Sequence, residues 1–214
     1  MRKILFAALV LGAAPAYAQD SEAADGKIGG ARIEVRAGME RPNLSDTQSG
    51  TTYVASLGTG LVYGGEIGYD IPVGNNLTVG PYVGIDGGGA DKCETYTDPG
   101  VNGTACFKGN SNISGGVRLA FASPKTELYV GLGYSSYNLD FTLRETAVVG
   151  GATVFSYDSL GSRGGLDVAL GANFNVGRHT YVGVGMKVGE YGDFEGSGFS
   201  LQRFQGHVAL GLRF

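Results

Sequence analysis

The last nine residues of the chain alternate strictly between apolar side chains and small or polar ones. The apolar positions are Val208, Leu210, Leu212 and Phe214. A period of two is typical of a β-strand whose two faces differ in character. Such a strand needs an apolar environment along one face, which is either a protein core or the hydrocarbon of a membrane.

The N-terminus has the three parts of a secretory signal peptide. Arg2 and Lys3 precede an apolar run over residues 4–14, and residues 16–18 read Ala-Tyr-Ala, a small-residue cleavage site. The apolar run is too short to span a bilayer as a helix. We therefore predict an exported chain with a signal peptide over 1–18, a short periplasmic lead-in over 19–30 and one membrane domain over 31–214.

Charge and glycine content narrow the class of protein further. The formal charge of −4 becomes −6 once Arg2 and Lys3 leave with the signal peptide. Because there is also no cluster of Lys and Arg, no nucleic-acid partner is expected. Glycine makes up 39 of the 214 residues, against an average of about 7%. These glycines alternate with Val, Leu and Tyr, so we expect them to make room for larger neighbours inside a narrow barrel.

Eight stretches carry the alternation, and their apolar faces contain no Asp, Glu, Lys or Arg. A charge on the lipid face costs about 2–4 kcal/mol for Arg or Lys at mid-bilayer. This segregation is therefore what exposure to lipid would enforce. The apolar sets are Ile33/Val35/Ala37/Met39, Leu61/Tyr63/Ile67/Tyr69/Ile71, Leu77/Val79/Val83/Ile85, Ile113/Val117/Leu119/Phe121, Leu128/Val130/Leu132/Tyr134, Leu166/Val168/Leu170/Phe174/Val176, Val182/Val184/Met186/Val188 and Phe204/Val208/Leu210/Leu212/Phe214.

The lengths of the connections separate a membrane barrel from a soluble sandwich, which would show the same alternation. Short connections fall at 72–76, 122–126 and 177–180, and long polar ones at 41–58, 87–110, 144–163 and 189–198. Long and short alternate strictly, as in outer-membrane barrels with long external loops and short periplasmic turns. We predict an all-β fold, an eight-stranded antiparallel up-and-down transmembrane β-barrel with four external loops.

Three predicted strands begin with Tyr-Val-Gly, at Tyr82, Tyr129 and Tyr181. With the signal peptide, the eight strands and the final Leu-Gly-Leu-Arg-Phe, these motifs make the chain resemble the small outer-membrane β-barrel family. That family includes the transmembrane domain of outer-membrane protein A, the opacity proteins and other "porin family" proteins. The resemblance implies localisation in the cell outer membrane, contact with its lipid and lipopolysaccharide, and insertion by the barrel-assembly machinery with help from periplasmic chaperones. It implies an assembly signal made of Val208, Leu210, Leu212 and Phe214, and we expect a monomer.

Cys93 and Cys106 lie in the second predicted external loop. An even number of cysteines in an exported chain predicts a disulfide between them. There is no Cys-x-x-Cys motif and no neighbouring set of further ligands, so a staple within the loop is favoured over a metal or redox site. Closing a ring of this size stabilises the fold by about 3 kcal/mol in the chain-entropy model.

Charged residues on the inward faces are expected to pair with one another. The interior of an eight-stranded barrel is just wide enough to be filled by side chains, and an unpaired buried charge is costly. Cross-strand geometry places Glu66 opposite Glu34 or Arg36. The predicted lumen charge network joins Glu34, Arg36 and Glu66 in one group, Arg118 with Glu127, and Asp167 with Lys187.

Three functions follow from this architecture. The favoured one is a structural or surface-display role, with four external loops and a polar, largely filled lumen. The first alternative is a narrow porin-like channel for ions or small solutes, in which the lumen charges act as a gate. The second alternative is a lipid A-modifying enzyme.

The enzyme alternative needs a histidine near the outer rim beside a serine or a carboxylate. His179 falls in a periplasmic turn, and His207 points into the lumen toward the periplasmic side. No catalytic residue is therefore predicted. Residues 87–89, which are Gly-Gly-Gly, lack the context of a phosphate loop, and the acidic residues lack the spacing of a calcium loop. No cofactor and no metal are expected.

Overall fold

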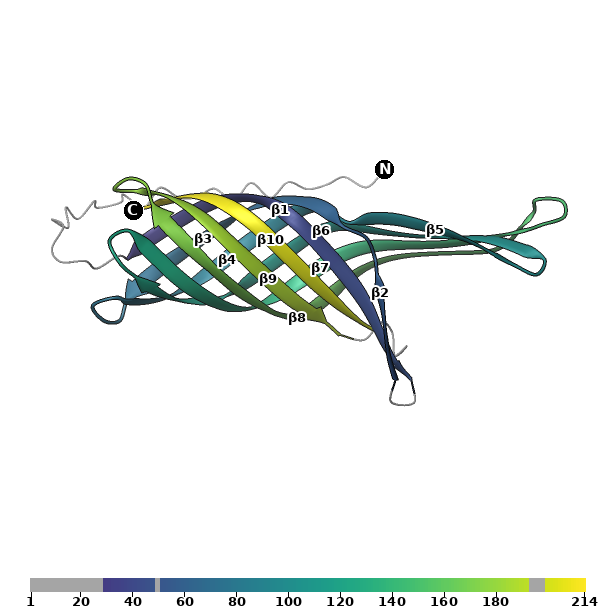
Figure 1. Ribbon diagram of the computed structural model, residues 1–214, viewed down its shortest axis with the longest axis horizontal. Coiled ribbons are helices and arrows are strands. Elements are labelled where there is room, and N and C mark those ends of the chain that lie inside the picture. Colours follow the sequence, from purple (N-terminus) through teal and green to yellow (C-terminus); the bar gives the residue numbers. More distant parts are fainter. Residues whose placement is uncertain (1–28, 49–50, 193–198) are drawn as a thin grey trace.

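The computed structural model describes residues 29–48, 51–192 and 199–214, most of them in β-strands (Figure 1). No helix within these residues is long and apolar enough to cross a membrane. The predicted signal peptide, the lead-in up to residue 28 and residues 193–198 of the fourth predicted loop lie outside the described residues. The strands are β1 (Gly30–Gln48), β2 (Thr51–Ser56), β3 (Gly60–Pro72), β4 (Leu77–Gly89), β5 (Asp91–Asp98), β6 (Val101–Ala122), β7 (Thr126–Ala147), β8 (Thr153–Asn175), β9 (Thr180–Tyr191) and β10 (Phe199–Arg213).

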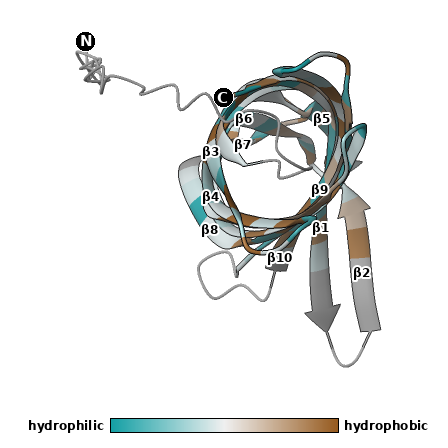
Figure 2. Cartoon of the chain, turned by 90° about the vertical axis from the view of Figure 1, so that its left-hand side faces the viewer, coloured by the Kyte–Doolittle hydropathy of each residue, from teal (hydrophilic) through white to brown (hydrophobic). Residues whose placement is uncertain are grey.

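Eight of these strands form a closed antiparallel ring. Its order is β1-β3-β4-β6-β7-β8-β9-β10, and β10 pairs with β1 to complete it. The closing pair is long, running from Arg32 opposite Arg213 to Asp46 opposite Phe199. Figure 2, which looks toward one end of the molecule, shows the resulting cylinder. The predicted eight-stranded barrel is confirmed.

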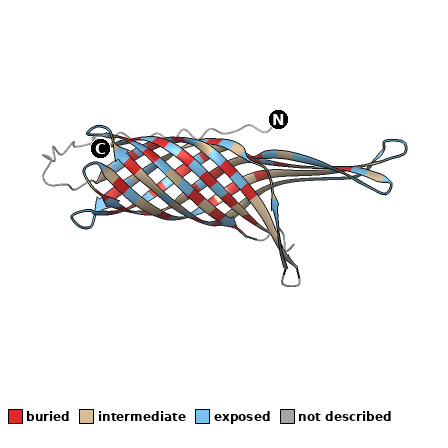
Figure 3. Ribbon diagram, viewed as in Figure 1, coloured by how far each residue is buried: buried red, intermediate tan, exposed pale blue. Residues whose placement is uncertain are grey.

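Side chains in the ring alternate between a buried and an exposed face (Figure 3). All of the predicted lipid-facing residues are exposed or half-buried, and Leu166 reaches 72% exposure. Their inward neighbours, such as Asp167 and His207, are buried. The exposed face is apolar and the buried face is charged, which is the reverse of a water-soluble protein. The apolar band therefore faces membrane lipid.

Short turns close one end of the barrel at the three positions that the sequence predicts. Each is held by a backbone hydrogen bond. Val73 donates to the carbonyl of Leu77 at 2.9 Å, and Gly177 donates to that of Thr180 at 3.2 Å. In the third turn, between β6 and β7, the Ser123 amide donates to the carbonyl of Thr126 at 2.8 Å. The C-terminus lies at this end (Figure 1), which is the periplasmic end in barrels with this pattern of connections.

The first three long connections, predicted as loops, are mainly extensions of the strands, so the prediction of loops was wrong there. β6 and β7 have 22 residues each and β8 has 23, whereas about 9–11 suffice to cross a membrane. β5 pairs with the outer part of β6. Together, residues 91–106 and 141–159 form a four-stranded sheet that projects beyond the ring (Figure 1), called the arm here. Continuing the ladder satisfies backbone groups that a loop would leave to water.

A second, shorter hairpin leaves the same end of the barrel. β2 pairs with the outer part of β1, from Asn43 opposite Ser56 to Gln48 opposite Thr51. It occupies most of the first predicted loop. The two additional strands, β2 and β5, lie outside the ring, which explains why ten strands build an eight-stranded barrel.

Inward tyrosines explain much of the glycine content. Tyr181 stands directly opposite Gly211, where an added Cβ atom would lie 2.0 Å from the tyrosine Cζ. A Cβ atom at Gly185 would lie 2.6 Å from the hydroxyl of Tyr129. Both approaches are too close for any side chain larger than hydrogen. These glycines therefore provide the space in which large rings cross the lumen, as the sequence predicts for a narrow barrel.

Candidate functional site: the charged interior of the barrel

The first layer of lumen charges, near the periplasmic end, is centred on Glu127 of β7, which is fully buried. Arg213 of β10 donates to one carboxylate oxygen at 2.6 Å. Asn173 of β8 donates to the other at 2.9 Å, and Arg118 of β6 donates to the same oxygen. Arg213 also lies 3.4 Å from Asp70 of β3. Residues from four strands thus meet at one carboxylate, and a fifth strand supplies Asp70 to Arg213.

The second layer contains two carboxylates that face each other. Glu66 of β3 stands opposite Glu34 of β1 in the strand register. Two arginines of β1 bind Glu66, with Arg32 donating to one oxygen at 2.8 Å and Arg36 to the other at 2.9 Å. Arg36 also donates twice to Asp86 of β4, at 2.7 and 3.2 Å. The guanidinium groups compensate the carboxylate repulsion that this register would otherwise create.

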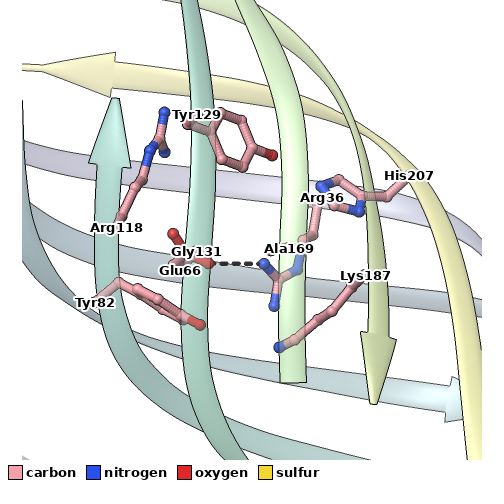
Figure 4. A pocket seen from close by; sticks show the side chains of 9 residues that line it. All are labelled: Arg36, Glu66, Tyr82, Arg118, Tyr129, Gly131, Ala169, Lys187 and His207. Carbon is pink, nitrogen blue, oxygen red and sulfur yellow. Dashed lines mark hydrogen bonds and ion pairs between the residues drawn. The ribbon is translucent and has the colours of Figure 1, made fainter. Parts of the chain in front are cut away.

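A small cavity lies beside this layer (Figure 4). Its volume is about 20 Å³, which is room for about one water molecule. Lys187 lies 3.5 Å from Asp167, which also accepts a hydrogen bond from the Tyr82 hydroxyl at 3.3 Å. His207 lines the cavity with Arg36 and Lys187, midway along β10. His207 was predicted to lie toward the periplasmic side, but the structure places it near the middle of β10, which runs from Phe199 to Arg213, beside Arg36 and Lys187.

The third layer, near the outer mouth, is centred on Glu40 of β1. One carboxylate oxygen accepts the Tyr137 hydroxyl at 2.8 Å and the Ala90 amide at 3.0 Å. The other oxygen binds Arg203 of β10, whose guanidinium carbon lies 5.1 Å from the centre of the Tyr137 ring. β1 and β7 lie four places apart in the ring of eight. The hydrogen bond from Tyr137 to Glu40 therefore joins opposite walls.

An apolar cluster fills the outer mouth around this layer. Its members come from β6, β7, β9, β10 and the residue between β4 and β5, and two further leucines pack against them from the first hairpin and its connection to β3. Burial of such side chains excludes water from the space between the strands. The cluster comprises Ala90, Phe107, Tyr137, Leu139, Tyr191 and Leu201, with Leu44 and Leu57 packed against it.

All seven predicted lumen charges point inward, and each has an ion-pair partner. The predicted neighbours Arg118 and Glu127, and Asp167 and Lys187, are in contact. The predicted network was nevertheless incomplete, because further charges on the same face take part. The alternation continues beyond the predicted strand ends, and following it would have identified Glu40 and Arg203. The members missing from the prediction are Arg32, Glu40, Asp70, Asp86, Arg203 and Arg213.

The arm holds the two cysteines. Cys93 of β5 stands directly opposite Cys106 of β6, and a disulfide joins them with their Cα atoms 4.0 Å apart. Farther out, the Tyr96 hydroxyl donates to Glu145 of β7 at 2.5 Å, and this hydrogen bond raises the pKa of Tyr96. Tyr96 reaches β7 because the residue between them on β6 is Gly103. Covalent and polar contacts therefore tie β5 to the rest of the arm.

The predicted assembly-signal residues point outward along β10. Val208, Leu210, Leu212 and Phe214 are 44–65% exposed. The Phe214 amide donates to the carbonyl of Ala31 at 2.9 Å, and its ring stacks on His179 with centroids 6.4 Å apart. The last residue is thus placed at the seam where the ring closes.

An apolar outer wall around a charged interior defines an integral β-barrel of the bacterial outer membrane. The chain belongs to the outer membrane protein beta-barrel domain family, whose sequence model matches residues 4–214. No curated protein matched the sequence.

Several solved structures are similar to this chain. Ail of Yersinia pestis has 13% identity and a TM-score of 0.41, over 88% of this chain and 100% of that one. Neisserial surface protein A has 16% identity and a TM-score of 0.45, over 85% of this chain and 97% of that one. The outer membrane protease OmpT from Escherichia coli has 11% identity and a TM-score of 0.46, over 90% of this chain and 99% of that one.

Deleting Phe214 alone is expected to slow insertion in cells. The deletion removes the last outward aromatic residue, its stacking on His179 and its bond to Ala31, and leaves the lumen layers intact. Precursor should accumulate in the periplasm, while refolding into detergent micelles should change far less. Pulse-chase labelling at low expression measures the first effect. Insertion as fast as that of the parent would contradict the role of Phe214 in assembly.

Proposed function

We propose that this protein is a closed membrane anchor that presents its arm at the cell surface. The observation that carries the proposal is the set of hydrogen bonds that cross the lumen. Tyr137 reaches Glu40 near the outer mouth, and Tyr82 reaches Asp167 in the middle. Arg213 reaches Glu127 near the periplasmic end. Three closures in series leave no continuous path for a hydrated ion.

The arm supports the display role. It extends each of β6, β7 and β8 well beyond the length needed to cross the membrane. On the arm, the rings of Phe141 and Tyr157 lie together with their centroids 6.5 Å apart. Paired aromatic side chains on a sheet beyond the membrane are suited to contact another molecule.

The same geometry argues against catalysis at either histidine. His207 lies inside the closed lumen, between layers that separate it from both mouths. His179 lies in a periplasmic turn and contacts the Arg213 carbonyl and Phe214. We infer a protein without enzymatic activity. We also infer a monomer, because the ring closes on itself and leaves no unpaired strand edge within the membrane.

Single-channel recording in planar bilayers tests the closed lumen. The wild-type protein is expected to give no current steps, and Glu66→Ala is expected to give none either, because the layer at Glu40 remains closed. A porin measured in the same bilayers serves as the positive control. Stepwise conductance from folded wild-type protein would contradict the proposal and favour the channel alternative.

A variant without the arm tip provides the matched control. Residues 94–105 and 144–156 are each replaced by Asn-Gly, a two-residue hairpin turn. Cys93 stays opposite Cys106, and Leu143 stays opposite Tyr157. This variant should insert and remain equally closed. Loss of insertion would show that the arm serves the barrel rather than a contact at the surface.

A further inference from the structure

The outer wall of the barrel has a groove where the outward row of β10 lacks a side chain. This row contains Phe204, Gly206 and Val208, and an added Cβ atom at Gly206 would meet no atom within 4 Å. Met39 of β1 and Met186 of β9 stand directly opposite Gly206 on its two sides. The groove between them has a volume of about 330 Å³, at the lower end of ligand-site volumes, which run from about 300 to 1,000 Å³.

The groove lies near the outer side of the apolar band. Gly206 is eight residues from Phe214 along β10. At about 3.4 Å per residue and a tilt of about 40°, this places it roughly 20 Å above the periplasmic edge of a band about 25 Å tall. Only the hydrocarbon of the outer leaflet reaches the wall at this height. The side chains around the groove match that environment, since Met39, Met186 and Phe204 are apolar and 41–56% exposed.

A cation stands directly above the groove. Arg41 follows Met39 on the outward face of β1, opposite Phe204, and lines the upper end of the groove. Its side chain is exposed and donates one hydrogen bond, to the Ser56 hydroxyl at 3.1 Å. Within the described part of the chain, Arg41 forms no ion pair. Its charge is therefore available to an anionic group at the membrane surface.

We propose that this groove binds one acyl chain of lipid A, the phosphorylated glycolipid of the outer leaflet, with a lipid phosphate on Arg41. Lipid acyl chains surround the wall at this height, so an acyl chain is the apolar segment that meets the groove from the membrane. A phosphate complements the guanidinium group at the height where the lipid head groups begin. The proposal concerns the outer wall and is independent of whether the lumen conducts.

Native mass spectrometry of the detergent-solubilised protein, titrated with purified lipid A, tests the site. The wild-type barrel should retain one lipid A molecule. Gly206→Leu fills the groove and should weaken retention about tenfold. Arg41→Gln should weaken it about fivefold, the effect of one interfacial basic residue, and should have little effect on dephosphorylated lipid A. The matched controls are Ala37→Leu on the same outer wall and Arg144→Gln on the arm, both of which should bind as the wild type does.

Migration on gels with and without heating confirms that each variant is folded before binding is measured. If Gly206→Leu does not fold, Arg41→Gln still decides the question, because that side chain lies above the apolar band. Equal retention by the wild type, Gly206→Leu and Arg41→Gln would overturn the proposal. Equally tight binding of phosphatidylglycerol would overturn the assignment to lipid A.

Discussion

Replacing Val208 with arginine is expected to prevent insertion of the barrel, and Leu170→Arg should do the same. Both side chains face lipid near mid-wall, where they are 58% and 47% exposed. A lipid-facing arginine at mid-bilayer costs about 2–4 kcal/mol, a large share of the net stability of a small domain. Gel migration with and without heating measures the folded fraction in outer-membrane preparations.

Gln205→Arg is the matched control on the opposite face. Gln205 is buried in the lumen, directly opposite Glu40 on one side and Lys187 on the other. An arginine there gains a carboxylate neighbour, so it should be tolerated better than at either outward position. Equal tolerance at all three sites would mean that the assignment of inward and outward faces is wrong.

Glu127→Ala is expected to destabilise the barrel by about 3–5 kcal/mol, the usual cost of removing one partner from a buried ion pair. The substitution leaves Arg118, Arg213 and Asn173 without their shared acceptor. The chain contains no tryptophan, so urea unfolding in lipid vesicles is best followed by far-ultraviolet circular dichroism. A much lower midpoint with an unchanged slope is the expected result.

Glu94→Ala provides the comparison for an exposed pair. Glu94 lies 2.6 Å from Lys92 on the arm, and both side chains are accessible to solvent. Exposed pairs contribute about 0–1 kcal/mol, so the unfolding midpoint should hardly change. A loss of stability in Glu127→Ala as small as that in Glu94→Ala would show that the first layer does not hold the barrel together.

The strands of the ring could be predicted because contact with lipid requires an apolar side chain at each outward position. Each position must be apolar whatever its neighbours are, so the pattern is readable one strand at a time. Some lumen contacts were predictable for a related reason. Arg118 and Glu127 lie on consecutive strands of a short hairpin, and the turn length sets their offset.

The contacts between opposite walls could not be predicted in this way. The bond from Tyr137 to Glu40 depends on the tilt and stagger of the closed ring, which no single hairpin determines. The arm was missed because its strands face water and look like polar loops. The sequence did contain a signal for these strands, because β-branched residues favour strands. Thr95 and Thr97 are two residues apart on β5, and Thr104 of β6 stands opposite Thr95.

The pairing of β1 with β10 means that the barrel can close only when its first and last strands are both present. The first and last strands of the ring are partners along 15 residue pairs, so the sheet keeps two open edges until the end of the chain has been delivered. A polypeptide truncated before β10 has no route to closure, and open edges invite aggregation and proteolysis. Ring closure therefore depends on the strand at the far end of the domain, and the first and last strands are needed together before either has its full set of backbone partners.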